Sequence, residues 1–209
     1  MKIAVIAANG KEGKLVVEEA LRRGHDVTAV VRGENRSAAT QAIVKDILDL
    51  AREDLAGFDA VVDAFGAWAP DTLDQHTKTS QHLCDILAGN DTRLLVVCGA
   101  GSLYMNPEHT TQLLETPEFP AEYVPLASAQ RDELDALRSR DDVRWTFVSP
   151  AADFQAEGAR TGAYLLAGEE FTTNDKGESA ISYADYAVAL IDEIEQGSHI
   201  QQRISVLGK

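Results

Sequence analysis

The sequence has few cysteines and basic residues, and it has no long hydrophobic run. Its 209 residues include only two cysteines, Cys84 and Cys98. One lies in a helix-like segment and the other in an apolar run, a usage typical of a reduced cytoplasmic protein and not of a disulfide framework. The longest apolar runs, 3–8 and 94–98, are much shorter than the ~18 residues that a membrane span needs. The first residues also lack the pattern of a signal peptide, so we expect neither secretion nor a membrane partner.

The scarcity of basic residues excludes another class of function. Nineteen Lys and Arg side chains stand against 34 Asp and Glu, a formal net charge of −15. Such a chain repels nucleic acid and anionic lipid, so we expect no nucleic-acid partner. We expect a small-molecule substrate, and a chain that acts as a monomer or homodimer. An anionic ligand then requires a local binding device that overcomes this field.

What the sequence does contain is an alternation of short apolar strands and amphipathic helices. β-branched runs predict strands at Lys2–Ile6, Asp26–Val31, Asp59–Phe65, Arg93–Cys98, Val143–Val148 and Arg203–Leu207. Periodic apolar residues predict helices at 13–23 and 77–88, a third helix capped by Ser128, and a fourth that begins at Ser182 and ends at Gly197. Continuous apolar strands joined by helices predict a doubly wound, parallel α/β sheet.

The periodicity is interrupted twice in the second half of the chain. Residues of about 104–127 form a proline-containing stretch, and residues of about 150–180 are again irregular. We expect one domain over 1–209, with these two insertions forming a small C-terminal lobe on the substrate side. In such folds the ligand crevice lies at the carboxyl ends of the strands, where the insertions begin.

The turn after the first strand supplies the local anion-binding device. It reads Ala-Ala-Asn-Gly-Lys-Glu-Gly over residues 7–13 and leads directly into a helix. Gly10 lets the backbone approach a pyrophosphate, Gly13 lets the helix pack closely on the strand, and the helix amino terminus offers free N–H groups. A triphosphate-binding loop is disfavoured, because Ala8 and Leu15 occupy positions where that motif needs Gly and Ser or Thr.

The end of the second strand bears on the choice of nucleotide. An NAD-selective site presents an Asp or Glu there, whereas this chain has Arg32, with Arg36 close behind it. An arginine can pair with a 2′-phosphate or stack on adenine, so the sequence favours NADP(H) and leaves NAD(H) possible. The nearby Glu34 instead favours NAD(H), because its carboxylate would repel a 2′-phosphate.

Several motifs occur in an order that is specific to one group of proteins. They are Asn9-Gly10-x-x-Gly13, Arg23-Gly24-His25, Asp46-Ile47-Leu48-Asp49, Ala64-Phe65-Gly66-Ala67, Gly99-Ala100-Gly101-Ser102-Leu103, Phe119-Pro120-Ala121-Glu122-Tyr123, Ser149-Pro150-Ala151 and Ser182-Tyr183-Ala184-Asp185-Tyr186. With them the whole chain resembles the atypical short-chain dehydrogenase/reductase superfamily, and within it the small bacterial NADH-flavin reductases. The resemblance implies a Rossmann-like, NAD(P)-binding fold.

The resemblance also implies which residues hold the cofactor. The pyrophosphate would lie on Asn9, Gly10, Lys11, Glu12 and Gly13, the adenosine half on Arg32, Asp46 and Ile47, and the rest of the cofactor along Phe65, Gly66, Ala67, Gly99, Ser149, Pro150 and Ala151. Ala7 replaces the usual first glycine of the loop. We expect it to be tolerated if its backbone dihedrals remain negative.

The chemistry of the group divides according to a Tyr-x-x-x-Lys pair, which this chain lacks. No tyrosine has a lysine four residues after it, so nothing obvious stabilises the alkoxide of an alcohol–ketone reaction. Reduction of a flavin or quinone-like planar acceptor avoids this requirement, because the product anion is delocalised and water can protonate it. The same absence leaves a second hypothesis open, a non-catalytic NAD(P) redox sensor. A sugar-nucleotide epimerase is a poorer third.

Candidate residues for the substrate side come from the strand ends and the first insertion. Ser102 and Tyr123 are the predicted catalytic residues, and His76, Tyr104 and Phe119 are the predicted substrate-binding residues. Each also has a structural interpretation as a cap, a packed aromatic or a surface histidine. No metal-binding or hydrolase motif is present, so we expect no metal.

Overall fold

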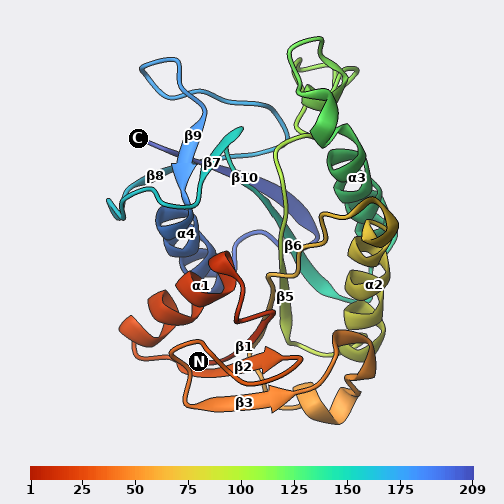
Figure 1. Cartoon of the computed structure of the whole chain (residues 1–209), viewed down its shortest axis with the longest axis vertical. Helices are drawn as coiled ribbons and strands as arrows, with labels where there is room; N and C mark the ends of the chain where they lie inside the picture. The colour runs from red at the N-terminus through yellow and green to blue at the C-terminus, as the bar shows by residue number, and fades with distance from the viewer.

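An eight-stranded sheet forms the centre of the computed structural model, which describes all 209 residues (Figure 1). Its order is β3-β2-β1-β4-β5-β6-β10-β8, and every neighbouring pair is parallel except β10 and β8. The strands are β1 (Lys2–Ile6), β2 (Asp26–Val31), β3 (Gln41–Val44), β4 (Ala60–Asp63), β5 (Arg93–Val97), β6 (Arg144–Ser149), β8 (Tyr164–Ala167) and β10 (Gln202–Gly208). The predicted doubly wound parallel sheet is confirmed.

Four helices cover the two faces of this sheet. The helices α1 (Lys11–Arg22) and α4 (Tyr183–Gln196) pack together on one face, and α2 (Gln75–Leu87) and α3 (Val124–Arg138) pack on the other (Figure 1). Strand β1 shows why both faces are apolar: Ile3 and Val5 enter the core under α1 and α4, whereas Ala4 and Ile6 enter the core under α2 and α3. A strand that is buried on both faces reads as a continuous apolar run.

The order of the strands places a crevice beside β1. The chain moves outward from β1 to β2 and β3, then returns to the other side of β1 to form β4. The loops after β1 and β4 therefore diverge at the carboxyl edge of the sheet, where doubly wound proteins bind their ligands. None of the helices combines the length and the apolar character that would let it cross a membrane.

Two predicted element boundaries are wrong for identifiable reasons. The third helix begins at Val124, with a proline in its first turn, and not at a cap on Ser128. Proline suits the first turn because its missing N–H is unpaired there in any helix. Strand β3 was not predicted, because it is an edge strand of only four residues whose side chains are largely exposed.

The second insertion is more regular than the sequence predicts. It contains β8, which extends the main sheet antiparallel to β10, and β7 (Asp153–Gln155), which pairs with β9 (Ala180–Ser182) in a separate two-stranded sheet. This insertion is therefore partly regular, because its strand β8 belongs to the central sheet. The first insertion is irregular. An isolated bridge between Tyr104 and Glu170 joins it to the second insertion, and a bridge between Tyr104 and Gln112 lies within it.

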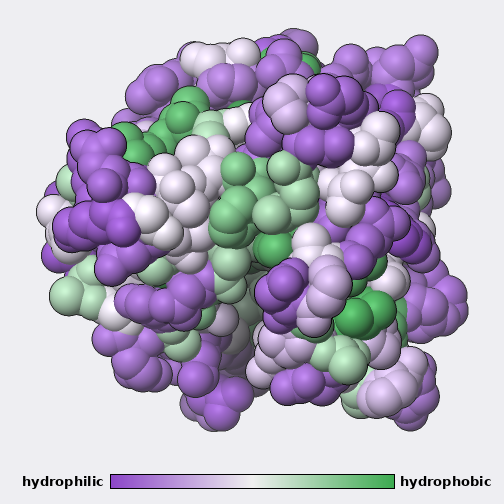
Figure 2. Space-filling model, turned by 90° about the horizontal axis from the view of Figure 1, so that it is seen from above, coloured by the Kyte–Doolittle hydropathy of each residue, from purple (hydrophilic) through white to green (hydrophobic).

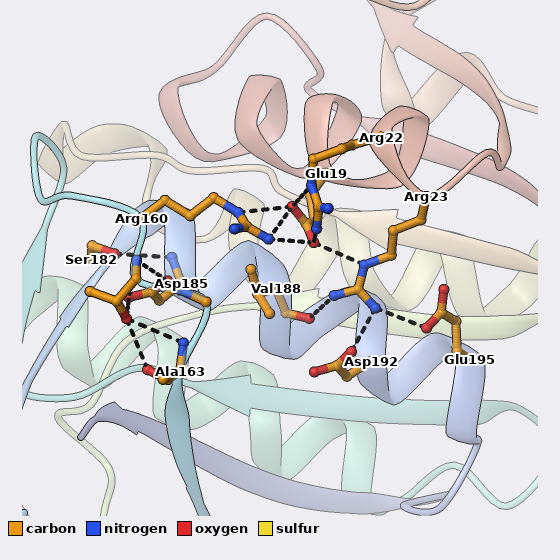
Figure 3. A network of polar contacts seen from close by, with 12 residues as sticks. Glu19, Arg22, Arg23, Arg160, Ala163, Ser182, Asp185, Val188, Asp192 and Glu195 are labelled. Carbon is orange, nitrogen blue, oxygen red and sulfur yellow. Dashed lines mark hydrogen bonds and ion pairs between the residues drawn. The ribbon is translucent and has the colours of Figure 1, made fainter.

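A polar network fixes the second insertion to the helices of one face (Figure 3). Glu19 of α1 accepts hydrogen bonds from Arg23 and from Arg160 of the insertion. One turn of the insertion is held separately, because the carboxylate of Asp185 accepts the backbone N–H groups of Thr161 and Gly162. The loop that leads from β6 towards the cleft is thus anchored on α1 and α4.

Candidate functional site: a cleft at the carboxyl edge of the sheet

A cleft of about 1530 Å³ lies at the carboxyl edge of the sheet. The loops that follow β1, β2, β4, β5 and β6 line it, together with the first insertion and the start of α4. Seen from above, the molecule has a hollow with apolar surface in the middle and hydrophilic surface around it (Figure 2). A cleft of this size accommodates a dinucleotide together with a second small molecule.

The loop between β1 and α1 is shaped to receive an anion. The Gly10 N–H donates to the carbonyl oxygen of Ala7 at 2.8 Å, which closes the turn. A Cβ on Gly13 would lie 2.5 Å from the same oxygen, so no larger residue fits there. The helix has no side-chain cap, and the backbone N–H groups of Lys11, Glu12 and Gly13 have no acceptor in the protein. Three free donors at a helix amino terminus fit a pyrophosphate group.

Ala7 departs from the expectation of negative dihedrals. Its φ is +55°, in the left-handed region that is unfavourable for a residue with a Cβ. The conformation directs the Ala7 carbonyl to the Gly10 N–H and against Gly13. Alanine is therefore tolerated by a different route from the one predicted, at a strain of about 1 kcal/mol.

The side chain of Asn9 braces two loops of the site. Its amide donates to the backbone oxygen of Glu34 at 2.9 Å, and its amide oxygen accepts the backbone N–H of Arg36 at 2.6 Å. These bonds connect the glycine loop to the segment after β2. Asn9 lines the cleft as predicted, and its side chain holds the two loops in place through these hydrogen bonds.

The segment after β2 brings cations to one end of the cleft. Arg32 and Arg36 both line it, and neither guanidinium is paired with a protein carboxylate. Lys45, also at this end, is instead paired with Asp54 at 2.7 Å. The carboxylate-bearing Glu34 lines the same end. Two unpaired arginines in an otherwise acidic protein form a binding place for a phosphate or an adenine ring.

The remaining predicted cofactor residues divide into those in the cleft and those behind it. In the cleft lie Asp46, Ile47, Phe65, Gly66, Ala67, Gly99, Pro150 and Ala151. One Asp46 oxygen accepts the Leu48 N–H at 3.0 Å, so Asp46 also caps the short turn that carries Ile47. Ser149 is fully buried at the end of β6, next to Cys98, and does not line the cleft.

Glycines after β5 let helix α3 approach the cleft. A Cβ on Gly99 would lie 2.4 Å from the Gln130 side-chain oxygen, and one on Gly101 would lie 2.6 Å from the Ala127 Cβ. Gln130 therefore lies against the backbone of Gly99 and lines the cleft. The sequence analysis missed Gln130, since its only signal is its position on a helix face.

Aromatic side chains surround the other end of the cleft. Phe119 and Tyr123 line it from the first insertion, as predicted, and Tyr123 is 49% exposed. Trp68, which the sequence analysis missed, lies in the loop after β4 and is 69% exposed. Its signal was available, because it follows Phe65 and Ala67 in the segment predicted to line the cofactor. Exposed aromatic faces at a cleft provide stacking surfaces for planar molecules.

Glu12 of the glycine loop and Tyr183 of α4 lie within electrostatic reach of each other. Glu12 is only 7% exposed, and neither of its carboxyl oxygens has a hydrogen-bond partner. Burial raises the pKa of Glu12 well above 4.5. Burial also raises the pKa of Tyr183, and the charge of an ionised Glu12 would raise it further. Both residues line the cleft.

Two residues predicted for the substrate side lie elsewhere. Ser102 is buried, and its hydroxyl accepts a hydrogen bond from Arg203 at 3.0 Å. The ring of Tyr104 stacks on His109, with the Arg203 guanidinium 5.4 Å from its centre. Neither residue lines the cleft. The predicted catalytic role of Ser102 and substrate-binding role of Tyr104 are therefore corrected: both residues fasten the first insertion to β10.

His76 is also placed behind the cleft and not in it. It is 2% exposed, and its Nε2 lies 3.1 Å from the Ala67 carbonyl oxygen and 3.3 Å from the Ala67 N–H. Burial lowers the pKa of His76 and raises the pKa of its neighbour Glu133 well above 4.5. Burial also raises the pKa of Asp63 in the same pocket to about 6. His76 supports the cleft wall at Ala67, so its predicted contact with substrate is wrong.

Comparison with known proteins agrees with this geometry. The model of a family described as NAD(P)H-binding matches residues 7–196. A crystal structure from Streptococcus pneumoniae TIGR4, that of SP1627, described as "a putative NADH-flavin reductase", is 60% identical, with a TM-score of 0.98 and full coverage of both chains.

Two further relatives extend over the whole chain. The uncharacterized protein YwnB of Bacillus subtilis (strain 168) is 46% identical, over 100% of this chain and 99% of that protein. A structure from Bacteroides thetaiotaomicron, described as a "putative epimerase", is 36% identical with a TM-score of 0.83, covering 99% of this chain and 96% of the other. The fold is thus shared by relatives with different descriptions.

Proposed function

Since the chain belongs to the NAD(P)H-binding family, we propose that it is an NAD(P)H-dependent oxidoreductase that reduces a flavin or a quinone-like planar acceptor. The observation that carries this proposal is the division of one continuous cleft. Free N–H groups and unpaired arginines occupy one end, and exposed aromatic side chains occupy the other. The first end suits a dinucleotide, and the second suits a flat, conjugated molecule.

The residues of the chain would act chiefly by positioning. Lys11, Glu12 and Gly13 hold the pyrophosphate through their N–H groups, and the walls at Gly99 and Ala151 leave room for the reactive ring. A bound dihydronicotinamide supplies the hydride. Trp68, Phe119 and Tyr123 orient the acceptor and exclude water from its face. Tyr123 has no neighbouring lysine that would make it an acid, and a delocalised product anion does not require one.

The test of the acceptor class is turnover with defined compounds. We expect the purified protein to oxidise NADPH in the presence of FMN, riboflavin or a quinone, measured as the loss of reduced-nicotinamide absorbance. Trp68→Ala should raise KM for the acceptor about fivefold with less change in kcat, because a stacking contact of about 1 kcal/mol is removed. Leu166→Ala is the control, as Leu166 is exposed on β8 outside the cleft.

Binding without turnover would favour the sensor. If NADPH and NADP⁺ bind with similar affinity and none of the acceptors is reduced, the reductase proposal is overturned. The missing Tyr-x-x-x-Lys pair then has its explanation in a protein that reports the redox state of its ligand to a partner.

We further propose that NADP(H) is preferred over NAD(H), with Arg32 and Arg36 contacting the 2′-phosphate. Both guanidinium groups line the cleft without a protein partner, so they need not break an ion pair to bind a ligand. Arg32→Ala should weaken NADPH binding about tenfold, the value of one charge-assisted hydrogen bond, and leave NADH binding nearly unchanged. Fluorescence titration with both nucleotides measures this, with Arg144→Ala, at the amino edge of the sheet, as the control. Equal losses for the two nucleotides would contradict the assignment.

A further inference from the structure

The position of Glu12 is unusual for a glutamate at a dinucleotide loop. It follows Lys11, the first residue of α1, and lines the cleft, yet it is 7% exposed and neither carboxyl oxygen has a hydrogen-bond partner. A buried carboxyl group without a partner is costly, whether it is charged or neutral. When the protein supplies no hydrogen-bond partner for such a group in a binding cleft, a bound ligand can supply it.

The surroundings of Glu12 contain no cation that would compensate a negative charge. Burial is the cause of its raised pKa, and no positively charged side chain opposes it. Lys11, the adjacent residue, has an exposed side chain whose ammonium lies 3.9 Å from Glu157. Burial without a partner favours the neutral form of the Glu12 carboxyl group, and a neutral carboxylic acid has one O–H to donate.

The titratable groups that face Glu12 from the other elements do not change charge near neutrality. Tyr183 and Tyr186 approach from α4, and burial raises the pKa of both phenols. Cys98 lies next to Tyr186, and burial raises the pKa of its thiol well above 9. The two phenols therefore do not compete with Glu12 as the source of a pH effect between 6 and 9.

The direction of the cleft tells which part of a dinucleotide reaches this carboxyl group. The cations at Arg32 and Arg36 mark the adenosine end, and the free N–H groups of α1 mark the pyrophosphate. Glu12 lines the cleft beside these N–H groups, within electrostatic reach of Tyr183 of α4, and we infer that the nicotinamide half extends past it. That half is uncharged around its ribose hydroxyls and carboxamide oxygen, and these oxygens are hydrogen-bond acceptors.

We propose that Glu12 is a neutral acid that donates a hydrogen bond to an oxygen of the nicotinamide half of the dinucleotide, so that cofactor binding requires a proton on this side chain. This inference rests on the proposed use of the cleft for the cofactor. Ionised Glu12 would have no donor and would repel the pyrophosphate at the same helix end. Affinity then falls by up to tenfold for each pH unit above the pKa of Glu12.

The test is the pH dependence of NADH binding, followed by fluorescence titration between pH 6 and 9. NADH is chosen because it lacks the phosphate monoester of NADPH, whose second pKa lies near 6. We expect the affinity of the unaltered protein to fall as the pH rises. Glu12→Gln, which keeps a neutral donor, should bind with no such pH dependence. Glu12→Leu should be equally independent of pH but about tenfold weaker than Glu12→Gln, because it lacks the donor.

Two results would overturn the inference while leaving the proposed function intact. One is NADH affinity that does not depend on pH in the unaltered protein. The other is an infrared spectrum of the ligand-free protein at pH 7 that lacks a protonated-carboxyl band removed by Glu12→Gln. Failure of NADH and NADPH to bind at all would instead remove the proposed function itself.

Discussion

Helix α1 carries a buried glutamate near each end, and the pKa values of the two are shifted in opposite directions. Glu12 at the amino end is 7% exposed and Glu19 near the carboxyl end is 5% exposed. Burial opposes the charge of both. At Glu19, hydrogen bonds from Arg22, Arg160 and Arg23 outweigh burial and lower the pKa to about 2 (Figure 3). At Glu12 nothing outweighs it, and the pKa rises well above 4.5.

The difference separates a group that serves the fold from a group that serves a ligand. Glu19 is satisfied within the protein, and its arginines extend the network to Asp192 and Glu195 of α4. Glu12 is left unsatisfied at the edge of a cleft. Equal burial therefore says little about the role of a carboxyl group, whereas its partners say a great deal.

The largest expected effect is that of a substitution that disrupts the amino end of α1. In Gly13→Ala the new Cβ would lie 2.5 Å from the Ala7 carbonyl oxygen, a backbone atom in a turn that is already strained. The loop must move, so we expect cofactor affinity to fall at least about 100-fold, together with a loss of stability. Fluorescence titration with NADPH measures the first and urea unfolding the second.

The matched control for this change is Gly168→Ala, where a Cβ would meet nothing within 4 Å. It should bind NADPH like the unaltered protein. Unchanged affinity in Gly13→Ala would mean that the glycine loop does not hold the pyrophosphate.

The next largest effect is expected from a substitution that removes the ion pairs near the carboxyl end of α1. Glu19→Gln leaves Arg22, Arg23 and Arg160 without their shared anion, and we expect a loss of about 2 kcal/mol in the free energy of unfolding at pH 7. Because the pKa of Glu19 is lowered from 4.5 to about 2, its contribution is present above pH 4.5 and is lost as the pH falls towards 2. The difference between the two proteins in urea unfolding should shrink over that interval.

Glu18→Gln is the matched control on the same helix, since Glu18 is exposed. It should change the stability by less than about 0.5 kcal/mol. A similar loss in both variants would attribute the effect to net charge and not to the network of Figure 3.

The smallest expected effect is that of Glu12→Gln on stability, and it is opposite in direction to that of Glu19→Gln. Because the pKa of Glu12 is raised, the unfolded chain releases this proton above pH 4.5 while the folded protein retains it, so Glu12 weakens the fold as the pH rises. Glu12→Gln should therefore raise the Tm of the ligand-free protein at pH 8, with a gain that disappears towards pH 4. Thermal unfolding at several pH values measures it. A lower Tm at pH 8 would show that Glu12 has a stabilising partner.

Much of the cofactor end could be predicted from the sequence because its determinants are local. The run of residues 7–13 between a strand and a helix specifies the turn, its glycines and the helix amino terminus together. Arg32 follows directly from the end of β2. At the substrate end the prediction was weaker, since Ser102, Tyr104 and His76 were chosen by residue type and by proximity to strand ends.

The sequence by itself determined the parallel sheet and the glycine turn before α1, because both follow from patterns within a few consecutive residues. Only the tertiary structure decided the chemistry of the polar side chains. Arg203 donates a hydrogen bond to Ser102 from about a hundred positions away in the sequence, and Arg160 of the second insertion donates one to Glu19. No such partner reaches Glu12. Ionisation depends on which charges and dipoles lie within a few ångströms, and folding sets those neighbours independently of their distance along the chain.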